Sequence, residues 1–271
     1  SGAAYYPFVA RSPAPVLLVD PYTYAETEER EDVEIPVTEN TIALDRTGVD
    51  YEVWDTEIEG SPTADDLRPF RVVIWRINDS IWEEPNTISQ QEQNTITEYL
   101  ASGGSFMLSS MEILTRLSRA GSQAFLSNVL QVADFVWSDD IFAECPECHQ
   151  DYGAPSIEGN DLDSFTTGIL TDLDYSMYPE FNIEELGLFF GPDFTDIFVP
   201  TTNAVPIFFE PTGQVVGVRS PKTGSDSSGR VVFLSFPLDT VPLNAAAPNN
   251  RANLLRNLLV YLAPGINGFG T

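Results

Sequence analysis

The feature that most constrains the fold is a series of short apolar runs, several of which continue without alternation into a polar residue. The run at residues 16–19 ends at Asp20, and residues 71–75 form a second run that is rich in β-branched side chains. Continuous runs of this kind are typical of strands that are buried on both faces of a parallel sheet. Further strands are predicted at residues 51–55, 106–109, 196–199, 205–209, 215–218 and 230–236.

Helical segments separate the early strands. The clearest helix is predicted over residues 89–102, because Ser89 and Glu92 form a capping box and two glycines follow the segment. Shorter helices are predicted at residues 38–46 and 111–119, and a final leucine-rich helix at residues 249–262. The alternation of strands and helices predicts an α/β fold with a mainly parallel sheet flanked by helices.

The chain is predicted to form a single domain. Residues 1–14 are expected to be an extended, proline-containing lead-in, and residues 15–271 the α/β domain. Regular patterning is lost from residue 136 to about residue 184, where Asp, Gly, Pro and aromatic residues are frequent. This region is predicted to be an irregular insert.

The charge balance restricts the possible partners. The 271 residues include 41 acidic and 13 basic side chains, which gives a formal net charge of −28. Such a surface repels nucleic acid and anionic membranes, so both are excluded as partners. It suits a saline environment, divalent cations or a basic partner. No run of eighteen apolar residues occurs, so no membrane insertion is expected.

Three short sequences carry a resemblance to a known fold family. They are Tyr-Leu-Ala-Ser-Gly-Gly at residues 99–104, Ser-Ser-Met at residues 109–111, and Ser-Phe-Pro-Leu at residues 235–238. Their order and spacing resemble the class I glutamine amidotransferase-like (flavodoxin-like) fold over residues 15–135 and 195–265. The closest resemblance is to divergent versions in large secreted bacterial proteins.

This resemblance implies that the scaffold has lost its catalytic residues. Active members hold a cysteine nucleophile in a strand-to-helix turn, and their late strand ends in His-Pro-Glu. Here Ser110 takes the cysteine position, Phe236 the histidine position and Leu238 the acid position. A nucleophile needs a base within hydrogen-bond reach, so no enzyme activity is expected. The alternative is a hydrolase in which His149 acts as the base for Ser110.

The two cysteines and the one histidine of the chain all fall within residues 145–149, Cys-Pro-Glu-Cys-His. C-x-x-C-H is the attachment sequence of c-type haem. Cys145 and Cys148 would form the thioethers, and His149 would be the proximal iron ligand. Met177, Met107 and Met111 are the candidates within the chain for the sixth ligand.

Other interpretations of these residues stay open. Cys145 and Cys148 could instead form a disulfide that pins the insert. A metal site would combine the two thiolates and His149 with Glu144, Glu147 or Asp151. Separately, Asp20, Glu26 and Glu28 are candidate calcium ligands, because carboxylate oxygens bind Ca²⁺; a solvated acidic loop is the alternative.

The sequence therefore supports two functional hypotheses. The first is an exported electron-transfer protein that carries one covalent c-type haem on a non-catalytic amidotransferase-like scaffold within an extracellular assembly. Covalent haem attachment of this kind predicts an extracellular or periplasmic location, with the signal peptide already removed. The partners would then be a redox protein or identical subunits. The second is a non-enzymatic structural or binding module of a cell-surface assembly, with a Cys145–Cys148 disulfide.

Overall fold

The computed structural model describes residues 14–21, 35–79, 87–135, 153–183, 188–222 and 229–266 of the chain. Its strands are β1 (Val16–Asp20), β2 (Tyr51–Asp55), β3 (Val72–Arg76), β4 (Ser105–Ser109), β5 (Val132–Phe135), β6 (Ser156–Gly159), β7 (Leu170–Asp172), β8 (Phe181–Ile183), β9 (Leu188–Phe190), β10 (Phe198–Pro200), β11 (Val205–Phe209), β12 (Val215–Ser220) and β13 (Val231–Leu234). Its helices are α1 (Thr38–Thr47), α2 (Thr56–Glu59), α3 (Ala64–Leu67), α4 (Gln90–Ala101), α5 (Ile113–Arg119), α6 (Gln123–Asn128) and α7 (Arg251–Leu262), with a 3-10 turn at Leu238–Thr240.

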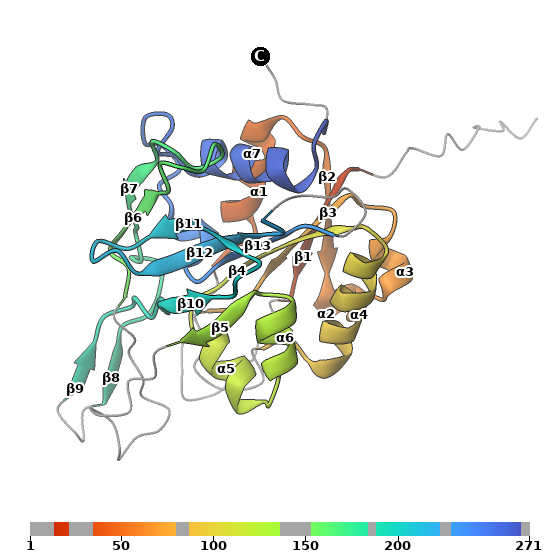
Figure 1. Ribbon diagram of the computed structural model, residues 1–271, viewed down its shortest axis with the longest axis horizontal. Coiled ribbons are helices and arrows are strands. Elements are labelled where there is room, and N and C mark those ends of the chain that lie inside the picture. Colours follow the sequence, from red (N-terminus) through yellow and green to blue (C-terminus); the bar gives the residue numbers. More distant parts are fainter. Residues whose placement is uncertain are drawn as a thin grey trace, which may run out of the picture.

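One large sheet forms the centre of the molecule, in the order β2-β1-β3-β4-β13-β12-β11-β6-β7 (Figure 1). The strands from β2 to β13 in this order are parallel, and those beyond β13 continue the sheet in antiparallel pairs. β10 joins through β12 and also pairs with β5. The α/β fold with a mainly parallel central sheet, expected from the alternation of strands and helices, is confirmed.

Alternate residues of each central strand face opposite helical layers, as the period of a β-strand requires. Val16 and Leu18 of β1 pack with α1 and α7, which cover one face of the sheet. Leu17 and Val19 pack with α3 to α6 on the other face. Both layers are visible in Figure 1. The continuous apolar run is therefore explained by burial on both sides.

Local signals mark the ends of the helices. Ser89 caps α4, and its reciprocal hydrogen bonds with Glu92 confirm the predicted capping box. Gly48 ends α1 in the left-handed conformation, at φ 80°. Asn250 caps α7 by accepting a hydrogen bond from the backbone of Asn253.

The region predicted as an irregular insert is partly regular. The structure describes its second half, where β6 and β7 extend the main sheet by pairing next to β11. Gly159 lets β6 run close to the loop before β7, because a Cβ atom there would lie 1.9 Å from the Thr166 carbonyl oxygen. These strands have only three or four residues each, which is too short for alternation to be detected. Among the described helices, none is long and apolar enough to cross a membrane.

Candidate functional site

The candidate site lies at the edge of the sheet where the parallel strands end. In open α/β sheets, ligands bind beyond the carboxyl ends of the strands, at the point where the strand order reverses. The order β2-β1-β3 places this switch point between β1 and β3. Asp20 ends β1 and Arg76 ends β3, so the two residues lie at the position where such a sheet would bind a ligand.

Asp20 and Arg76 neutralise each other there. Their side chains are 15% and 6% exposed, and Nη1 of Arg76 lies 3.5 Å from Oδ2 of Asp20. Nη2 of Arg76 also donates to the carbonyl oxygen of Ile35 at 2.7 Å. Because a guanidinium faces this carboxylate, Asp20 is poorly placed to bind a cation.

A second buried pair joins the ends of β3 and β4. The Oγ of Ser110 donates to Oδ1 of Asp79 at 2.7 Å, and the backbone N–H of Met111 donates to Oδ2 at 3.1 Å. Burial raises the pKa of Asp79 to about 7, against the opposing effects of Arg116 and of these hydrogen bonds. Asp79 is therefore a carboxylic acid that titrates near neutral pH inside the protein.

In the strand-to-helix turn after β4, the residue with a left-handed backbone is Glu112 and not Ser110, to which the resemblance assigns the nucleophile position. Glu112 has φ 60° and ψ −3° and precedes the first residue of α5. Left-handed backbone in a non-glycine residue is uncommon and marks special turns. The sequence placed Ser110 in the nucleophile position, but the backbone N–H of Ser110 still donates to Leu234 at 3.1 Å. Ser110 therefore directly follows β4 and is still held to β13 by this bond, and the left-handed residue comes two positions later.

Backbone donors around this turn are occupied by carboxylates of the chain. Asp79 accepts from the N–H of Met111, and Oδ2 of Asp196 accepts from the N–H of Leu114 at 3.4 Å. Such N–H groups would form an oxyanion hole in a hydrolase. Ser110 itself has no exposed surface. The Ser110 hydroxyl is therefore inaccessible, and two of the backbone donors near this turn already have carboxylate partners.

Another buried acid, Asp239, lies in the 3-10 turn that follows β13. The hydroxyl of Tyr178 donates to its Oδ1 at 2.5 Å, and the guanidinium of Arg251 contacts its carbonyl oxygen. Burial raises the pKa of the Asp239 carboxyl, whereas the Tyr178 hydrogen bond and the charges of Arg76 and Arg251 lower it.

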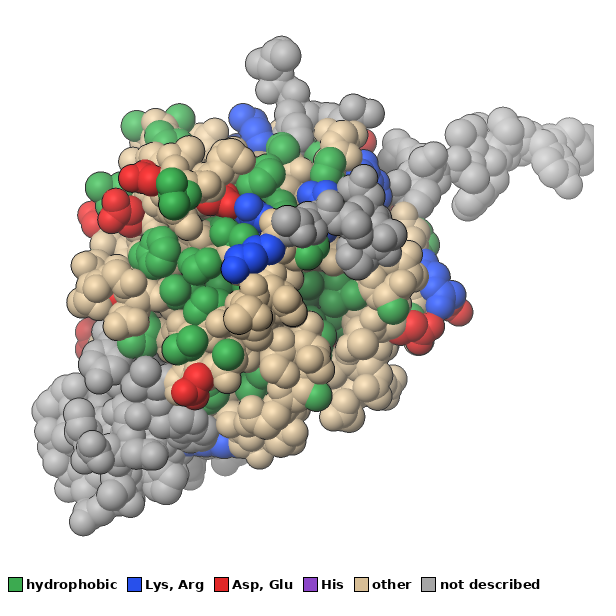
Figure 2. Space-filling model, viewed as in Figure 1, with side chains coloured by type: hydrophobic (Ala, Val, Ile, Leu, Met, Phe, Trp, Pro, Cys, Tyr) green, Lys and Arg blue, Asp and Glu red, His purple; other side chains and the backbone are tan. Residues whose placement is uncertain are grey.

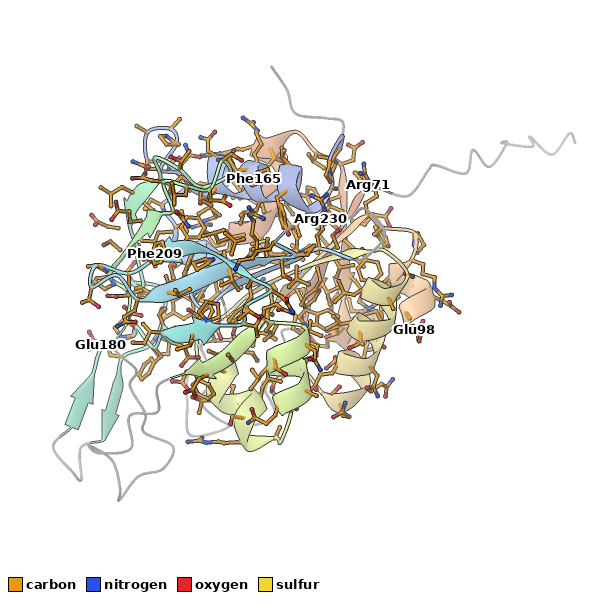
Figure 3. All side chains as sticks on the ribbon, in the orientation of Figure 1. Arg71, Glu98, Phe165, Glu180, Phe209 and Arg230 are labelled. Carbon is orange, nitrogen blue, oxygen red and sulfur yellow. The ribbon has the colours of Figure 1, made fainter. Side chains whose placement is uncertain are left out.

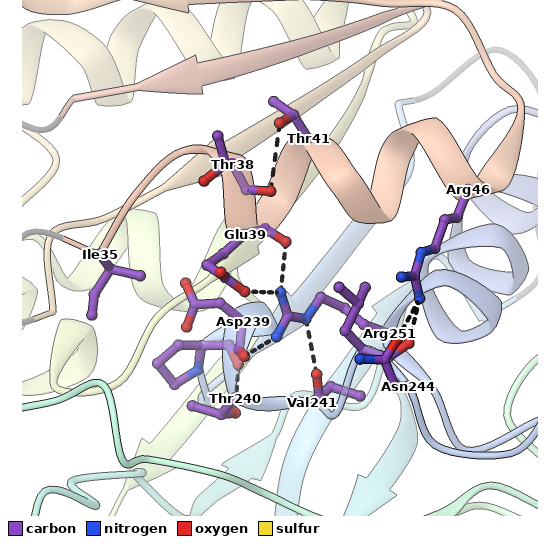
Figure 4. A network of polar contacts seen from close by, with 12 residues as sticks. Ile35, Thr38, Glu39, Thr41, Arg46, Asp239, Thr240, Val241, Asn244 and Arg251 are labelled. Atoms are coloured by element: carbon purple, nitrogen blue, oxygen red, sulfur yellow. Dashed lines mark hydrogen bonds and ion pairs between the residues drawn. The ribbon is translucent and has the colours of Figure 1, made fainter.

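Arg251 ties this segment to α1 (Figure 4). Its side chain is 4% exposed, and Nη1 lies 2.9 Å from Oε2 of Glu39 and 2.6 Å from the Glu39 carbonyl oxygen. Nε donates to the carbonyl oxygen of Val241 at 2.8 Å. One guanidinium thus connects α7, the turn after β13 and α1.

The positions that the resemblance assigns to the base and the acid lie in the core. Phe236 has no exposed surface and Leu238 is 4% exposed. Phe236 packs edge to face against Phe208, with ring centroids 5.9 Å apart. These side chains contribute packing and have no group that transfers a proton.

The predicted haem and calcium residues fall largely outside the described part of the chain. Cys145, Cys148, His149, Glu26 and Glu28 lie outside it, as do the alternative ligands Glu144, Glu147 and Asp151. Within the described residues, no group of three or more His, Cys, Asp or Glu side chains is arranged to hold a metal ion.

The three methionines named as candidate axial ligands differ in burial. Met107 and Met111 are 0% and 2% exposed and belong to the hydrophobic core. Met177 is partly buried and packs against the same core. Of the three, Met177 alone keeps part of its surface accessible to a group outside the core.

The sequence analysis did not identify four of the charged residues that form the site. Asp79, Asp239, Arg76 and Arg251 stand beside apolar segments without any recognised motif. The available signal was position along the chain. Each of the residues Arg76, Asp79 and Asp239 lies within a few residues of the end of a predicted strand. Arg251 gave no such signal, because the first turn of a surface helix is an ordinary place for an arginine.

Comparison with known proteins shows the fold. No family model and no curated protein matches the sequence. A putative ThuA-like protein from Bacteroides uniformis is similar in structure, with 12% identity, a TM-score of 0.54, and coverage of 98% of this chain and 97% of that chain. A cold-adapted β-galactosidase from Rahnella sp. R3 gives 12% identity and a TM-score of 0.51, covering 93% of this chain and 32% of that chain.

A glutamine amidotransferase from Thermotoga maritima gives 13% identity and a TM-score of 0.47, covering 91% of this chain and 96% of that chain. The chain spans about a third of the Rahnella enzyme and nearly all of the other two. The likeness to the ThuA-like protein and to part of the Rahnella enzyme shows an amidotransferase-like α/β fold, with its parallel strands in the order β2-β1-β3-β4-β13.

Proposed function

We propose that the chain is a non-enzymatic structural or binding module built on an amidotransferase-like scaffold. The observation that carries this proposal is the filling of the carboxyl edge of the sheet by the protein's own side chains. Ser110 is fully buried and donates to Asp79, while Asp20 pairs with Arg76. A nucleophile must be able to reach the substrate, and the buried hydroxyl of Ser110 cannot do so, although Asp79 lies within hydrogen-bond reach of it.

The occurrence of the fold within longer chains supports a modular role. In the Rahnella β-galactosidase, the region similar to this chain makes up 32% of the enzyme. The acidic composition and the amidotransferase-like resemblance to parts of secreted proteins favour a place in an extracellular or periplasmic assembly. There the module would bind a partner or hold other parts of an assembly in position.

A serine-directed fluorophosphonate probe tests the non-enzymatic proposal. We expect no labelling of the folded protein above the level seen with Ser110→Ala, because the Ser110 hydroxyl is inaccessible. Labelling would be quantified by intact mass spectrometry after a long incubation, with a serine hydrolase as positive control. Stoichiometric labelling that disappears in Ser110→Ala would identify a working nucleophile and overturn the proposal.

The second candidate function is electron transfer, and the C-x-x-C-H sequence at residues 145–149 specifically favours it. Bound haem would supply one-electron chemistry, and the chain would supply Cys145 and Cys148 for attachment and His149 for the iron. Met177 is the candidate sixth ligand. The partners would be a redox protein or identical subunits.

Absorption spectra of the natively exported protein, oxidised in air and then reduced with dithionite, separate the two candidates. For the cytochrome we expect a Soret band, sharp α and β bands on reduction, and an intact mass raised by one whole haem, because thiol addition to a vinyl group loses no atoms. Cys145→Ala with Cys148→Ala would abolish the colour. A colourless wild-type protein whose mass is two hydrogens short would establish the Cys145–Cys148 disulfide and exclude the cytochrome.

A further inference from the structure

A pocket lies at the edge of the sheet opposite the candidate site, where strands β3, β4 and β13 begin. Its volume is about 440 Å³, which is in the range of small-molecule sites. Arg68, Arg71 and Arg230 line it together with Tyr99, Ser105 and Leu262, which are among its other lining residues. Three cationic side chains around one pocket stand out in a chain with only 13 basic and 41 acidic residues.

Sheet pairing fixes the positions of two of these arginines. The N–H of Ser105 donates to the carbonyl oxygen of Arg71 at 3.1 Å, and the N–H of Phe106 donates to that of Arg230 at 2.8 Å. The backbones of Arg71 and Arg230 therefore flank the first residues of β4 on its two sides. Adjacent strands are about 4.8 Å apart, so these two backbones are separated by roughly 10 Å.

The guanidinium groups converge on the end of α7. Nη2 of Arg71 donates to the carbonyl oxygen of Pro264 at 2.9 Å, and Nη1 of Arg230 donates to that of Tyr261 at 2.7 Å. The Arg230 guanidinium also lies 5.2 Å from the centre of the Tyr261 ring. Figure 3 shows Arg71 and Arg230 near each other beside this helix. These contacts orient the cations, so a ligand need not order them on binding.

The charge of Arg71 is not neutralised within the described part of the chain, where its guanidinium meets a carbonyl and no carboxylate. Arg68 differs, because it pairs with Asp65 and, at 2.7 Å, with Glu98. The interior arginines are already paired within the protein, Arg76 with Asp20 and Arg251 with Glu39. In Figure 2, basic side chains lie towards the centre and upper part of the face, and most acidic ones towards its margins.

The floor of the pocket is rigid and polar. The hydroxyl of Tyr99 donates to the Phe70 carbonyl at 3.0 Å, and Ser105 Oγ donates to the Leu262 carbonyl at 2.7 Å. Gly104 brings the backbone against the Tyr99 ring, since a Cβ atom there would lie 2.2 Å from ring carbons. These bonds hold the cavity open between α4, α7 and the start of β4.

We propose that this pocket binds a small ligand that carries a carboxylate or phosphate group, with Arg71 as the main anion-binding residue and Arg230 beside it. A guanidinium presents N–H donors in a planar fork that matches both kinds of oxyanion. The pocket is separate from the carboxyl edge of the sheet, so the proposal holds whether the chain is a module or a cytochrome. It assigns a binding site to the amino edge, away from the usual site of this fold.

Isothermal titration of the full chain with citrate, and separately with inorganic phosphate, tests the proposal at constant ionic strength and pH 7. We expect binding of at least one anion, weakened about ten- to a hundredfold in Arg71→Gln, because a hydrogen bond to a charged group is lost. Arg46→Gln is the matched control. Arg46 is also exposed and donates to a backbone carbonyl, that of Leu243 at 2.8 Å, and it should leave binding unchanged.

Citrate binding without phosphate binding would identify a carboxylate ligand, and the reverse would identify a phosphate ligand. If Arg71→Gln fails to fold by circular dichroism, Arg68→Gln provides a second variant, since the Arg68 side chain pairs with Asp65 and Glu98 and makes none of the contacts with α7 described above. We expect it to weaken binding severalfold. The highest anion concentration would be 10 mM, which is about tenfold above a millimolar Kd. If neither anion gives detectable heat at that concentration, the proposal is overturned. Equal affinity in wild type and both pocket variants would also overturn it.

Discussion

Replacing Arg251 with methionine is expected to lower the free energy of unfolding by about 3–5 kcal/mol, because it breaks a buried ion pair by removing one partner. The guanidinium contacts the carboxylate and carbonyl of Glu39 and the carbonyls of Asp239 and Val241. Methionine has a similar length but no N–H donor. It would leave the carbonyl oxygens of Asp239 and Val241 without their donor inside the protein, and the Glu39 carboxylate, which is 27% exposed, without its cationic partner.

Urea denaturation followed by tryptophan fluorescence measures this effect. Arg256→Met is the matched control, because Arg256 lies on the same helix, is half buried, and donates to the Arg46 carbonyl at 3.1 Å. We expect the control to change the free energy of unfolding by about 1 kcal/mol or less. If Arg251→Met were as stable as the control, the network would contribute no net stability, as happens for some buried ion pairs.

Glu39→Gln in combination with Arg251→Met separates pairing from helix packing. If the Arg251–Glu39 contact carries part of the effect, the double variant will be less destabilised than the sum of the two single variants. Additive losses would instead assign the effect to the carbonyl contacts of Asp239 and Val241. The comparison therefore separates the contact of Arg251 with the Glu39 carboxylate from its contacts with backbone carbonyls.

The parallel half of the fold was predictable because its sequence pattern is local. Residues 16–19 and 71–75 form continuous apolar runs, and the structure buries these runs between two helical layers. The capping box of Ser89 and Glu92 placed the start of α4 correctly. The antiparallel extension was less accessible, because β6 and β7 have four and three residues and their pairing with β11 joins segments far apart in sequence.

The candidate site was less predictable than the fold, since it depends on groups from distant segments. The pair of Ser110 and Asp79 brings together residues 31 positions apart, and that of Arg251 and Glu39 residues 212 positions apart. No spacing rule connects such residues in a single sequence. The left-handed residue of the turn was also not predicted, because it is Glu112 and not the Ser110 that directly follows β4.

The buried carboxyl of Asp79 is expected to make the protein less stable as the pH rises from about 4 to 7. Its pKa is about 7 in the folded protein, compared with a usual value near 3.9 in an unfolded chain. Between these values the folded state binds the proton more tightly, so stability falls as the pH increases and levels off above 7. The full difference corresponds to on the order of 3–4 kcal/mol.

Asp79→Asn isolates this contribution. The side-chain carbonyl of asparagine can accept from the Met111 N–H, and its amide can donate to Ser110 Oγ, which still donates to the Met111 carbonyl. The variant thus resembles the protonated acid at every pH. Relative to wild type, we expect it to gain up to about 3 kcal/mol in the free energy of unfolding between pH 4.5 and pH 8.

The variant must be compared with wild type at each pH, because other charges around Asp79 also respond. Arg116 lies 3.7 Å from Asp79 and lowers its pKa, whereas the nearby charge of Asp239 raises it. Acids far from Asp79 titrate alike in both proteins and cancel in the difference, whereas Asp239 interacts with Asp79 and contributes to it. Asp66→Asn is a control whose difference from wild type should stay flat between pH 4.5 and pH 8, since hydrogen bonds from Thr63 lower the Asp66 pKa and its stabilising effect is lost only at lower pH.

Urea denaturation at constant ionic strength, repeated at half-unit steps of pH, gives the required difference curve. A wild-type loss that is absent from Asp79→Asn, with its midpoint between about pH 5 and 7, would establish Asp79 as the group that titrates. A difference that stays constant across this range would mean that Asp79 keeps one protonation state throughout. The buried carboxyl would then act only as a fixed hydrogen-bond partner of Ser110, and the pH dependence would arise from other acids.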